Sequence, residues 1–224
     1  MSSSGKLRIL FERSNRNLLI FTGVLAVIAI ATSTCAHWLS RFPGDLDLTL
    51  LFQSIHSNIL LSVMKWISYV TEGWRSALLV IIGSIVVWWR LGKLKAAITI
   101  TVGISSLLDS VLKVVVGRPR PTSDLVQVWV VEHNNSFPSG HAFFALMFLG
   151  LMAYFAFVHI RRQGFRVLIV VSLMILIILI GASRVYLGAH WPSDVLGGYV
   201  VGAVFLGIFI WLDRVLKRHF RIRT

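Results

Sequence analysis

The stretch VLIVVSLMILIILIGASRVYLGAHWPSD, residues 167–194, joins a long apolar run to a group of polar and charged side chains. The run is long enough to cross a bilayer, which takes about 20 mostly apolar residues. Arg184, His190 and Asp194 lie at its end. An ionised side chain in a membrane helix costs about 2.5–3.5 kcal/mol or more, so such residues are usually paired or functional. The stretch therefore predicts a membrane helix with a functional site at its end.

The composition supports a membrane protein. The chain has 224 residues, of which 56% are hydrophobic and 14% charged, whereas soluble domains carry about 25% charged residues. The net charge of +13 would suggest nucleic acid as a partner of a soluble protein. Here the cations cluster between apolar runs, as membrane topology requires. We expect one integral membrane domain over residues 1–224, with membrane lipids as its surroundings, no nucleic-acid partner and no obligate protein partner.

Six apolar runs predict an all-α fold. They cover residues 18–37, 75–91, 96–116, 141–159, 167–188 and 194–212. Residues 46–70 differ, because their apolar residues recur at helical spacing while polar residues such as Gln53 and Lys65 interrupt the other face. This pattern predicts an amphipathic helical segment between the first two spans, at the membrane interface or against the bundle.

The cations predict the topology. If residues 46–70 do not cross, most of the 22 Lys and Arg residues fall on one side. The positive-inside rule then places both termini in the cytoplasm. The cations on that side are Lys6, Arg8, Arg13, Arg16, Arg90, Lys93, Lys95, Arg161, Arg162, Arg166, Arg214, Lys217, Arg218, Arg221 and Arg223.

The first apolar run follows a basic segment, which leaves two interpretations. "ATSTCA", residues 31–36, is rich in small residues and fits a cleavable signal peptide. The run is longer than the usual ~7–15-residue signal core, so we favour a retained signal-anchor helix. The single cysteine, Cys35, is read as a small apolar residue. No Cys/His set has the spacing of metal ligands, and we predict neither a metal site nor a cofactor.

Three segments bring polar residues to the predicted outer face. They are "DSVLKVVVGRPRP" (109–121), "SFPSGHAFF" (136–144) and the end of the opening stretch. A cluster of cations with two histidines and a carboxylate suits a phosphate, because arginine can bind its oxygens with two parallel hydrogen bonds. These segments supply Lys113, Arg118, Arg120, Ser139, His141, Arg184, His190 and Asp194.

Local sequence features add to this site. "PSGH" reads as a helix start, where free N–H groups attract an anion. Gly140 lets a phosphate approach its backbone, since it has no Cβ. His190 and Asp194 are four residues apart, which can place them on one helix face. A carboxylate on one ring nitrogen leaves the other free to attack.

These residues resemble the three signature motifs of the type 2 phosphatidic acid phosphatase superfamily. Lys113, six residues and then Arg120-Pro121 match the first motif, and residues 138–141, Pro-Ser-Gly-His, match the second. The third is Ser183-Arg184, five residues, His190, three residues and Asp194. All three occur in order, and the motif core covers residues 109–194.

The resemblance implies a lipid phosphate or pyrophosphate phosphatase that needs no metal. His190 would be the nucleophile and form a phosphohistidine, Asp194 would orient it, and His141 would serve as acid and then as base. The groups that would hold or support the phosphate are Lys113, Arg120, Ser139, Gly140, Arg184 and, in a supporting role, Ser183.

Structural interpretations of the same residues stay open. Arg184 alone would fit an arginine that extends from a helix end to the headgroups. His190 and Asp194 alone would fit a structural pair, and His141 a histidine at a helix start.

Three further expectations concern the neighbours of the motifs. Asp109 lies one turn before Lys113, and we hypothesise that it positions this lysine, the alternative being plain pairing. Arg118 is expected to contact a headgroup or to make a secondary phosphate contact. "TEGWR", residues 71–75, is considered for the rim of the pocket.

A site at the outer ends of membrane helices suits a lipid with its phosphate at headgroup level. Among the lipids that the resemblance implies, the outward-facing site and the compact, bacterial-type length favour undecaprenyl pyrophosphate, in the plasma (bacterial inner) membrane. The alternatives are phosphatidylglycerol phosphate, phosphatidic acid, diacylglycerol pyrophosphate, a lipid A phosphate, or transfer of the phosphoryl group to another lipid. A lipid-phosphate transporter is the alternative from another class, but it would need neither a nucleophile nor an acid.

Overall fold

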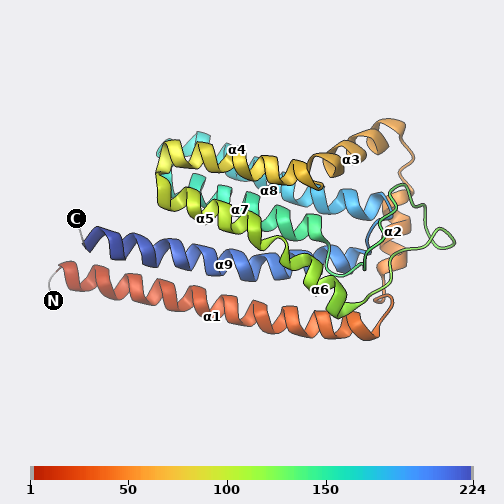
Figure 1. Cartoon of the computed structure of the whole chain (residues 1–224), viewed down its shortest axis with the longest axis horizontal. Helices are drawn as coiled ribbons and strands as arrows, with labels where there is room; N and C mark the ends of the chain where they lie inside the picture. The colour runs from red at the N-terminus through yellow and green to blue at the C-terminus, as the bar shows by residue number, and fades with distance from the viewer. Residues whose placement is uncertain (1–2, 223–224) are drawn as a thin grey trace.

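The computed structural model describes residues 3–222 of the chain, with side chains from 11 to 217, and this part is entirely helices and loops. The predicted all-α class is confirmed. The helices, shown in Figure 1, are α1 (Ser3–Trp38), α2 (Asp45–Gln53), α3 (Asn58–Val70), α4 (Trp74–Leu91), α5 (Lys93–Ser105), α6 (Leu108–Val116), α7 (Gly140–His159), α8 (Gln163–Tyr186) and α9 (Pro192–Ile222).

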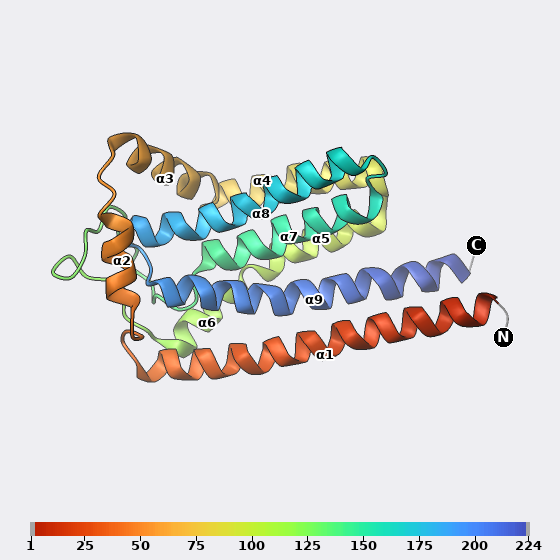
Figure 2. The ribbon, with the colours of Figure 1, turned by 180° about the vertical axis from the view of Figure 1, so that it is seen from behind.

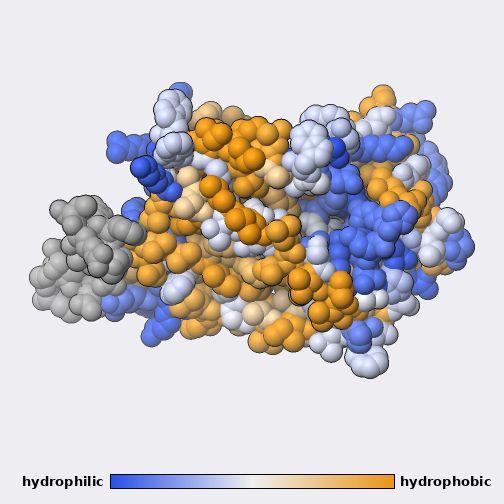
Figure 3. Space-filling view, in the orientation of Figure 1, coloured by the Kyte–Doolittle hydropathy of each residue, from blue (hydrophilic) through white to orange (hydrophobic). Residues whose placement is uncertain are grey.

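Six segments of the described chain are long and apolar enough to cross a membrane, which confirms the six predicted spans. They comprise α1 from Phe11, α4, α5 together with α6, α7, α8, and α9 as far as Lys217. On the face that Figure 3 shows, apolar surface predominates in the middle of the molecule and polar surface lies toward its ends. The chain is therefore an integral membrane protein.

Helix α7 forms the centre of the bundle. It packs against α8 and α9 along its length and also contacts α5 and α6. Its large apolar side chains, such as Phe143, Met147 and Leu151, are buried. By contrast, α1 packs mainly on α9 and exposes side chains such as Phe21 and Val27. In a bilayer such exposed apolar side chains face lipid.

The third span is divided into two helices, where a single one was expected. Ser106 and Leu107 donate their backbone N–H groups to carbonyls three residues earlier, at 3.2 and 3.1 Å. The Ser106 hydroxyl also donates to the Gly103 carbonyl, at 2.6 Å. Side-chain bonds of this kind compete with the helical pattern, and Gly and Ser pairs favour bends. The bend sets the direction of α6, which carries Asp109 and Lys113 of the candidate site.

Residues 46–70 also form two helices, with a break after Gln53. Ser57 caps α3 by accepting a hydrogen bond from the Leu60 N–H, at 3.2 Å. At 1.5 Å per residue neither α2 nor α3 can cross a membrane. Figures 1 and 2 show α2 across one end of the bundle, while the first turn of α1 and the last turn of α9 lie at the other end. That this segment lies at the membrane interface stays a prediction.

The end of the bundle that α2 crosses also carries the long α6–α7 connection, residues 117–139. Its backbone is fixed where Ser136 N–H donates to the Arg118 carbonyl, at 2.8 Å, and where Trp129 N–H donates to the Leu187 carbonyl, at 3.0 Å. Ordered connections of this length without regular structure are usually functional.

Candidate active site

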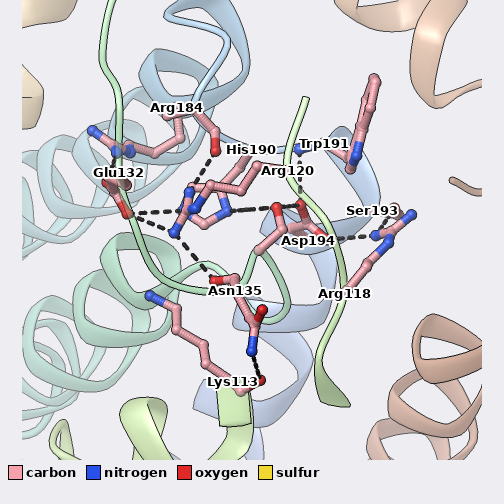
Figure 4. Close-up of polar contacts among 12 residues, drawn as sticks. Lys113, Arg118, Arg120, Glu132, Asn135, Arg184, His190, Trp191, Ser193 and Asp194 are labelled. Atoms are coloured by element: carbon pink, nitrogen blue, oxygen red, sulfur yellow. Dashed lines mark hydrogen bonds and ion pairs between the residues drawn. The ribbon is translucent and has the colours of Figure 1, made fainter. Parts of the chain in front are cut away.

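The three motif segments meet at the end of the bundle that α2 crosses. The side chains labelled in Figure 4 come from α6, the connection 117–139, the end of α8, the turn between α8 and α9, and the start of α9. A cavity of about 650 Å³ opens beside them. Residues that line it include Asp109, Lys113, Glu132, Asn134, Gly140, His141 and Phe144. Thr71, Glu72 and Gly73 line it as well, which confirms the expected rim.

His190 lies fully buried in the turn between α8 and α9. Gly188 shapes this turn with a φ of 67°, and a Cβ there would collide with the Gln127 carbonyl. The Nδ1 atom of His190 lies 3.7 Å from Asp194 Oδ2. The Nε2 atom lies 3.2 Å from Arg120 Nη1 and 4.0 Å from Glu132 Oε2. An arginine N–H at Nε2 favours the tautomer with its proton on Nδ1, which leaves the Nε2 lone pair facing the cations.

Asp194 lies in the first turn of α9, and His190 lies in the turn just before this helix, so the two side chains are close without sharing the helix face that the spacing of four suggested. Its Oδ2 atom accepts from the Trp191 N–H, at 2.9 Å, and from the Ser136 hydroxyl. Ser136 Oγ is also 3.5 Å from His190 Nδ1. The carboxylate and the hydroxyl therefore both lie on the Nδ1 side of the ring, as Figure 4 shows for the carboxylate.

Arg118 corrects one expectation. Its side chain is fully buried, and it pairs with two carboxylates, Asp194 and Asp45. The expectation of a headgroup or secondary phosphate contact was wrong, because a buried guanidinium with two carboxylate partners has no free face for a lipid. Asp45 was missed, since "FPGD", residues 42–45, reads as a turn and belongs to no motif.

Glu132 is the second residue that the sequence did not reveal. Its carboxylate pairs with Arg120, at 2.6 Å, and with Arg184. Arg120 also donates to the Asn134 side chain and to the Ala189 carbonyl. Glu132 is the single carboxylate between Asp124 and the PSGH motif. A lone carboxylate between two motifs that supply cations for a phosphate was the sequence signal that could have identified Glu132.

Burial and neighbouring charges shift the pKa values of the site residues that lie outside the membrane spans. Burial raises the pKa of the Glu132 carboxyl, but the positive charges of Arg184 and Arg120 outweigh it and hold the pKa below its usual range. Burial lowers the pKa of the Arg120 guanidinium, and Glu132 opposes this shift. Burial, and then Arg120 and Arg184, hold the pKa of His190 well below its ordinary value. His190 is therefore neutral at neutral pH, the state that a nucleophile needs.

Lys113 and Asp109 form the predicted pair on α6, with 3.0 Å between Nζ and Oδ2. The Asp109 carboxylate also lies against the α carbon of Gly140, where a Cβ would collide with it. The absence of a side chain at residue 140 thus lets α6 approach the start of α7 closely.

Six buried polar atoms of residues in or beside the site have no hydrogen-bond partner among the described residues: Asp109 Oδ1, Arg118 Nε, Ser139 Oγ, His141 Nε2, Arg184 Nε and Trp191 Nε1. Buried polar atoms are rarely left unpaired, so those of the motif residues Ser139, His141 and Arg184 are candidates for contacts with a ligand. Ser183 differs, because its buried hydroxyl donates to the Ile180 carbonyl within α8, at 2.7 Å. The supporting role of Ser183 therefore stays a prediction. Among the described residues, no group of three or more His, Cys, Asp and Glu side chains could hold a metal ion.

Comparisons with known proteins agree with the motifs. Residues 94–218 match the family model described as the PAP2 superfamily. Over 142 residues the chain is 33% identical to phosphatidylglycerophosphatase B of Bacillus subtilis (strain 168), covering 63% of this chain and 68% of the relative. It is 28% identical over 127 residues to YbjG of Escherichia coli (strain K12), which is named provisionally as an undecaprenyl-diphosphatase, covering 54% of this chain and 60% of the relative.

A solved structure extends the similarity to the whole bundle. The crystal structure of the transmembrane PAP2 type phosphatidylglycerolphosphate phosphatase from Bacillus subtilis aligns with a TM-score of 0.77 and 25% sequence identity. The alignment covers 88% of this chain and 98% of that protein.

Proposed function

The chain belongs to the PAP2 superfamily and is a membrane lipid phosphatase, and from this premise we propose that it acts through a phosphohistidine on His190. In the first step, His190 Nε2 attacks the terminal phosphorus and the bond to the leaving oxygen breaks. His141 gives its proton to that oxygen. In the second step, His141 takes a proton from water, whose oxygen attacks the phosphohistidine and releases orthophosphate and neutral His190.

The cations neutralise the phosphoryl group during both steps. Lys113, Arg120 and Arg184 bind its oxygens, while the Ser139 hydroxyl and the Gly140 N–H add hydrogen bonds. Phosphoryl transfer depends mainly on positioning and on stabilising charge at these oxygens. Asp194 faces Nδ1 of His190 and stabilises the positive charge of the phosphohistidine.

One observation supports this proposal above the others. The Glu132 carboxylate is held by Arg120 and Arg184, and its Oε2 atom lies 4.0 Å from His190 Nε2. For attack by His190 Nε2, the phosphorus atom of the substrate must come close to the position that the Glu132 carboxylate occupies. A carboxylate is a smaller anion than a phosphate. The position therefore already suits an anion.

The proposed substrate is phosphatidylglycerol phosphate, with undecaprenyl pyrophosphate second. The sequence placed undecaprenyl pyrophosphate first, but the relatives with 33% identity and with the TM-score of 0.77 are both named for phosphatidylglycerol phosphate. The cavity supports this order, because polar groups such as Thr71, Ser76 and Asn134 line it and can bind the hydroxyl of a glycerol headgroup. The provisional name of YbjG supports the second candidate.

We also propose that the site faces outward from a bacterial inner membrane, with cytoplasmic termini. The charge bias of the sequence supports this orientation. Arg13 and Arg16 lie in the N-terminal half of α1 and Arg214 lies in the C-terminal half of α9, which are the halves farther from the site. Lys6, Arg8, Arg218, Arg221 and Arg223, which add to the bias, lie outside the described side chains.

Phosphate release from purified protein tests the activity. Phosphatidylglycerol phosphate, undecaprenyl pyrophosphate and phosphatidic acid are each supplied in detergent with excess EDTA, and His190→Ala is the control. We expect release that survives EDTA, is fastest on phosphatidylglycerol phosphate and is lost in the variant. No release from a monodisperse sample would favour a phosphotransferase or transporter. Movement of labelled lipid between leaflets, or of label to an acceptor lipid, would then identify which.

A further inference from the structure

A buried charge network lies behind the proposed nucleophile, on the side away from the cavity. Arg118 is fully buried, and Asp45 and Asp194 are 3% and 0% exposed. Arg118 Nη2 is 2.9 Å from Asp45 Oδ2, and Arg118 Nη1 pairs with Asp194 Oδ1. One cation thus lies between two carboxylates, and the network carries a net charge of minus one. Figure 4 shows Arg118 and Asp194 on the opposite side of the His190 ring from Glu132.

Ser193 joins the two carboxylates to the start of α9. Its N–H donates to Asp45 Oδ1, at 2.9 Å, and its hydroxyl donates to Asp45 Oδ2, at 2.7 Å. Arg118 Nη1 in turn donates to the Ser193 hydroxyl, at 2.8 Å. Asp45 also accepts from the Phe42 N–H, at 2.8 Å. Every oxygen of Asp45 is therefore bound, and its position is fixed relative to the first turn of α9, which carries Asp194.

Asp45 lies at the start of α2, outside the residues that match the family model. The other end of α2 is held separately, where Gln53 Nε2 donates to the carbonyls of Gln127 and Tyr186, at 2.7 and 3.0 Å. These bonds carry no charge. One end of α2 therefore makes a charged contact with the network behind His190, and the other end makes only neutral contacts with the backbone around the turn that holds His190.

We propose that Asp45 and Arg118 are positioning residues for the nucleophile. Arg118 holds the Asp194 carboxylate on the Nδ1 side of His190, and Asp45 balances Arg118 so that one negative charge remains to face the imidazole. Without Asp45, Arg118 would neutralise Asp194 and weaken its attraction for the positive charge of the phosphohistidine. This inference rests on the proposed role of His190 as nucleophile.

The net charge of this network can be detected in the pH profile of kcat/KM. On the acid side, kcat/KM falls when His190 becomes protonated, and protonation is more favourable when the surroundings are more negative. Asp45→Asn makes the network neutral and should move the acid limb of kcat/KM to lower pH. Arg118→Gln makes it more negative and should move the limb to higher pH. The double variant restores one negative charge and should return the limb close to its original position. The other charged or titratable groups around His190, common to all these variants, are Arg41, Lys113, Arg120, Glu132, His141 and Arg184.

The experiment measures kcat/KM for phosphate release against pH with the full chain in detergent. We expect shifts of about one pH unit in opposite directions for the two single variants, as for a charge about 10 Å away at an effective dielectric constant of about 20. Gln53→Leu is the matched control, because it loosens the other end of α2 and changes no charge, so its limb should stay in place. The ionisation of the substrate affects every profile equally, so it does not shift the limb of one variant relative to another.

Each outcome decides the inference. If the acid limbs of all variants coincide and only the rate is reduced, the inference is overturned. Asp45 would then serve only to hold α2 in its place. If Asp45→Asn does not give a monodisperse protein, Arg118→Gln and the double variant decide: an upward shift that the second substitution reverses supports the inference, and coincident limbs overturn it. If His190→Ala hydrolyses the lipid at the original rate, the proposed function itself has failed, which is a different result from coincident limbs.

Discussion

At the scale of single residues, the binding of Glu132 to Arg120 and Arg184 has the widest consequence for function. A substrate phosphate needs the same two guanidinium groups, so it has to displace the carboxylate or share them with it. Charge-assisted pairs with arginine are among the strongest polar contacts in proteins. Glu132 therefore lowers the apparent affinity for any phosphate, whether substrate or product.

Glu132→Gln should tighten phosphate binding. The amide keeps the shape of the side chain but gives up the negative charge that competes for the arginines. We expect KM and the inhibition constant of orthophosphate to fall by about three- to tenfold, which corresponds to about 0.7–1.4 kcal/mol. Asp124→Asn is the matched control, since it removes an exposed carboxylate from the same connection. Unchanged or higher constants in Glu132→Gln would show that the carboxylate does not compete.

The pH dependence of kcat/KM should be bell-shaped, with an acid limb below pH 6.5. Burial, Arg120 and Arg184 lower the pKa of His190. A lowered pKa means that the ring stays neutral and able to attack as the pH falls through about 6.5, the ordinary value for histidine. Activity is then lost only at lower pH, and on the alkaline side when the acid that protonates the leaving oxygen is lost. A rate independent of pH from about 5 to 9 would contradict these roles.

The sequence predicted the residues of the motifs and missed those that hold them. His190, Asp194, Arg120, Arg184 and Lys113 gather as their spacing indicated. Asp45 and Glu132 lie in segments without helical or motif periodicity, so only tertiary contacts reveal them. The expectation for Arg118 was wrong because its position beside a proline says nothing about burial.

At the scale of secondary-structure elements, the bend before α6 decides where Lys113 points. Asp109 follows the bend directly and pairs with Lys113 one turn later. Asp109 also lies against Gly140, at the start of α7. This carboxylate therefore links the direction of α6 to the proposed phosphate-binding turn.

Asp109→Asn should lower kcat/KM by about 10- to 100-fold, the effect of losing about 1.4–3 kcal/mol from a charged hydrogen bond. Asp213→Asn is the matched control. It breaks a second buried lysine–carboxylate pair, Lys95–Asp213, at 2.7 Å, which lies outside the site. We expect that control to lower thermal stability but to keep kcat/KM. Full activity and stability in Asp109→Asn would refute the positioning role of Asp109.

The existence of the helices was predictable, but their breaks were not. Mean hydropathy is high enough over Lys93–Val116 for one span, so hydropathy does not separate α5 from α6, although Ser105 and Ser106 interrupt the apolar residues at the bend. The break between α2 and α3 depends on the cap at Ser57 and on contacts of Gln53 with distant residues. Hydrophobic periodicity does not record either kind of contact.

At the scale of the whole molecule, the orientation in the membrane can be tested with single cysteines. Cys35 is the only native cysteine, so Cys35→Ala gives a background without thiols. Asp124→Cys lies on the connection near the site and Gly164→Cys near the turn between α7 and α8, at the other end of the bundle. In intact inner-membrane spheroplasts, a membrane-impermeant maleimide should label residue 124 and leave residue 164 unlabelled until lysis. The reverse pattern would place the site in the cytoplasm.

The most direct test of the central claim is to trap the phosphoryl group on the enzyme. Lipid labelled with ³²P at its terminal phosphate is mixed with the full chain, and the reaction is quenched in alkali within milliseconds to seconds. The account predicts label on His190, stable to alkali and lost in acid, that disappears on a chase with unlabelled lipid and is absent from His190→Ala. Phosphate release at the normal rate with no labelled protein at any quench time, or label that persists in His190→Ala, would contradict it.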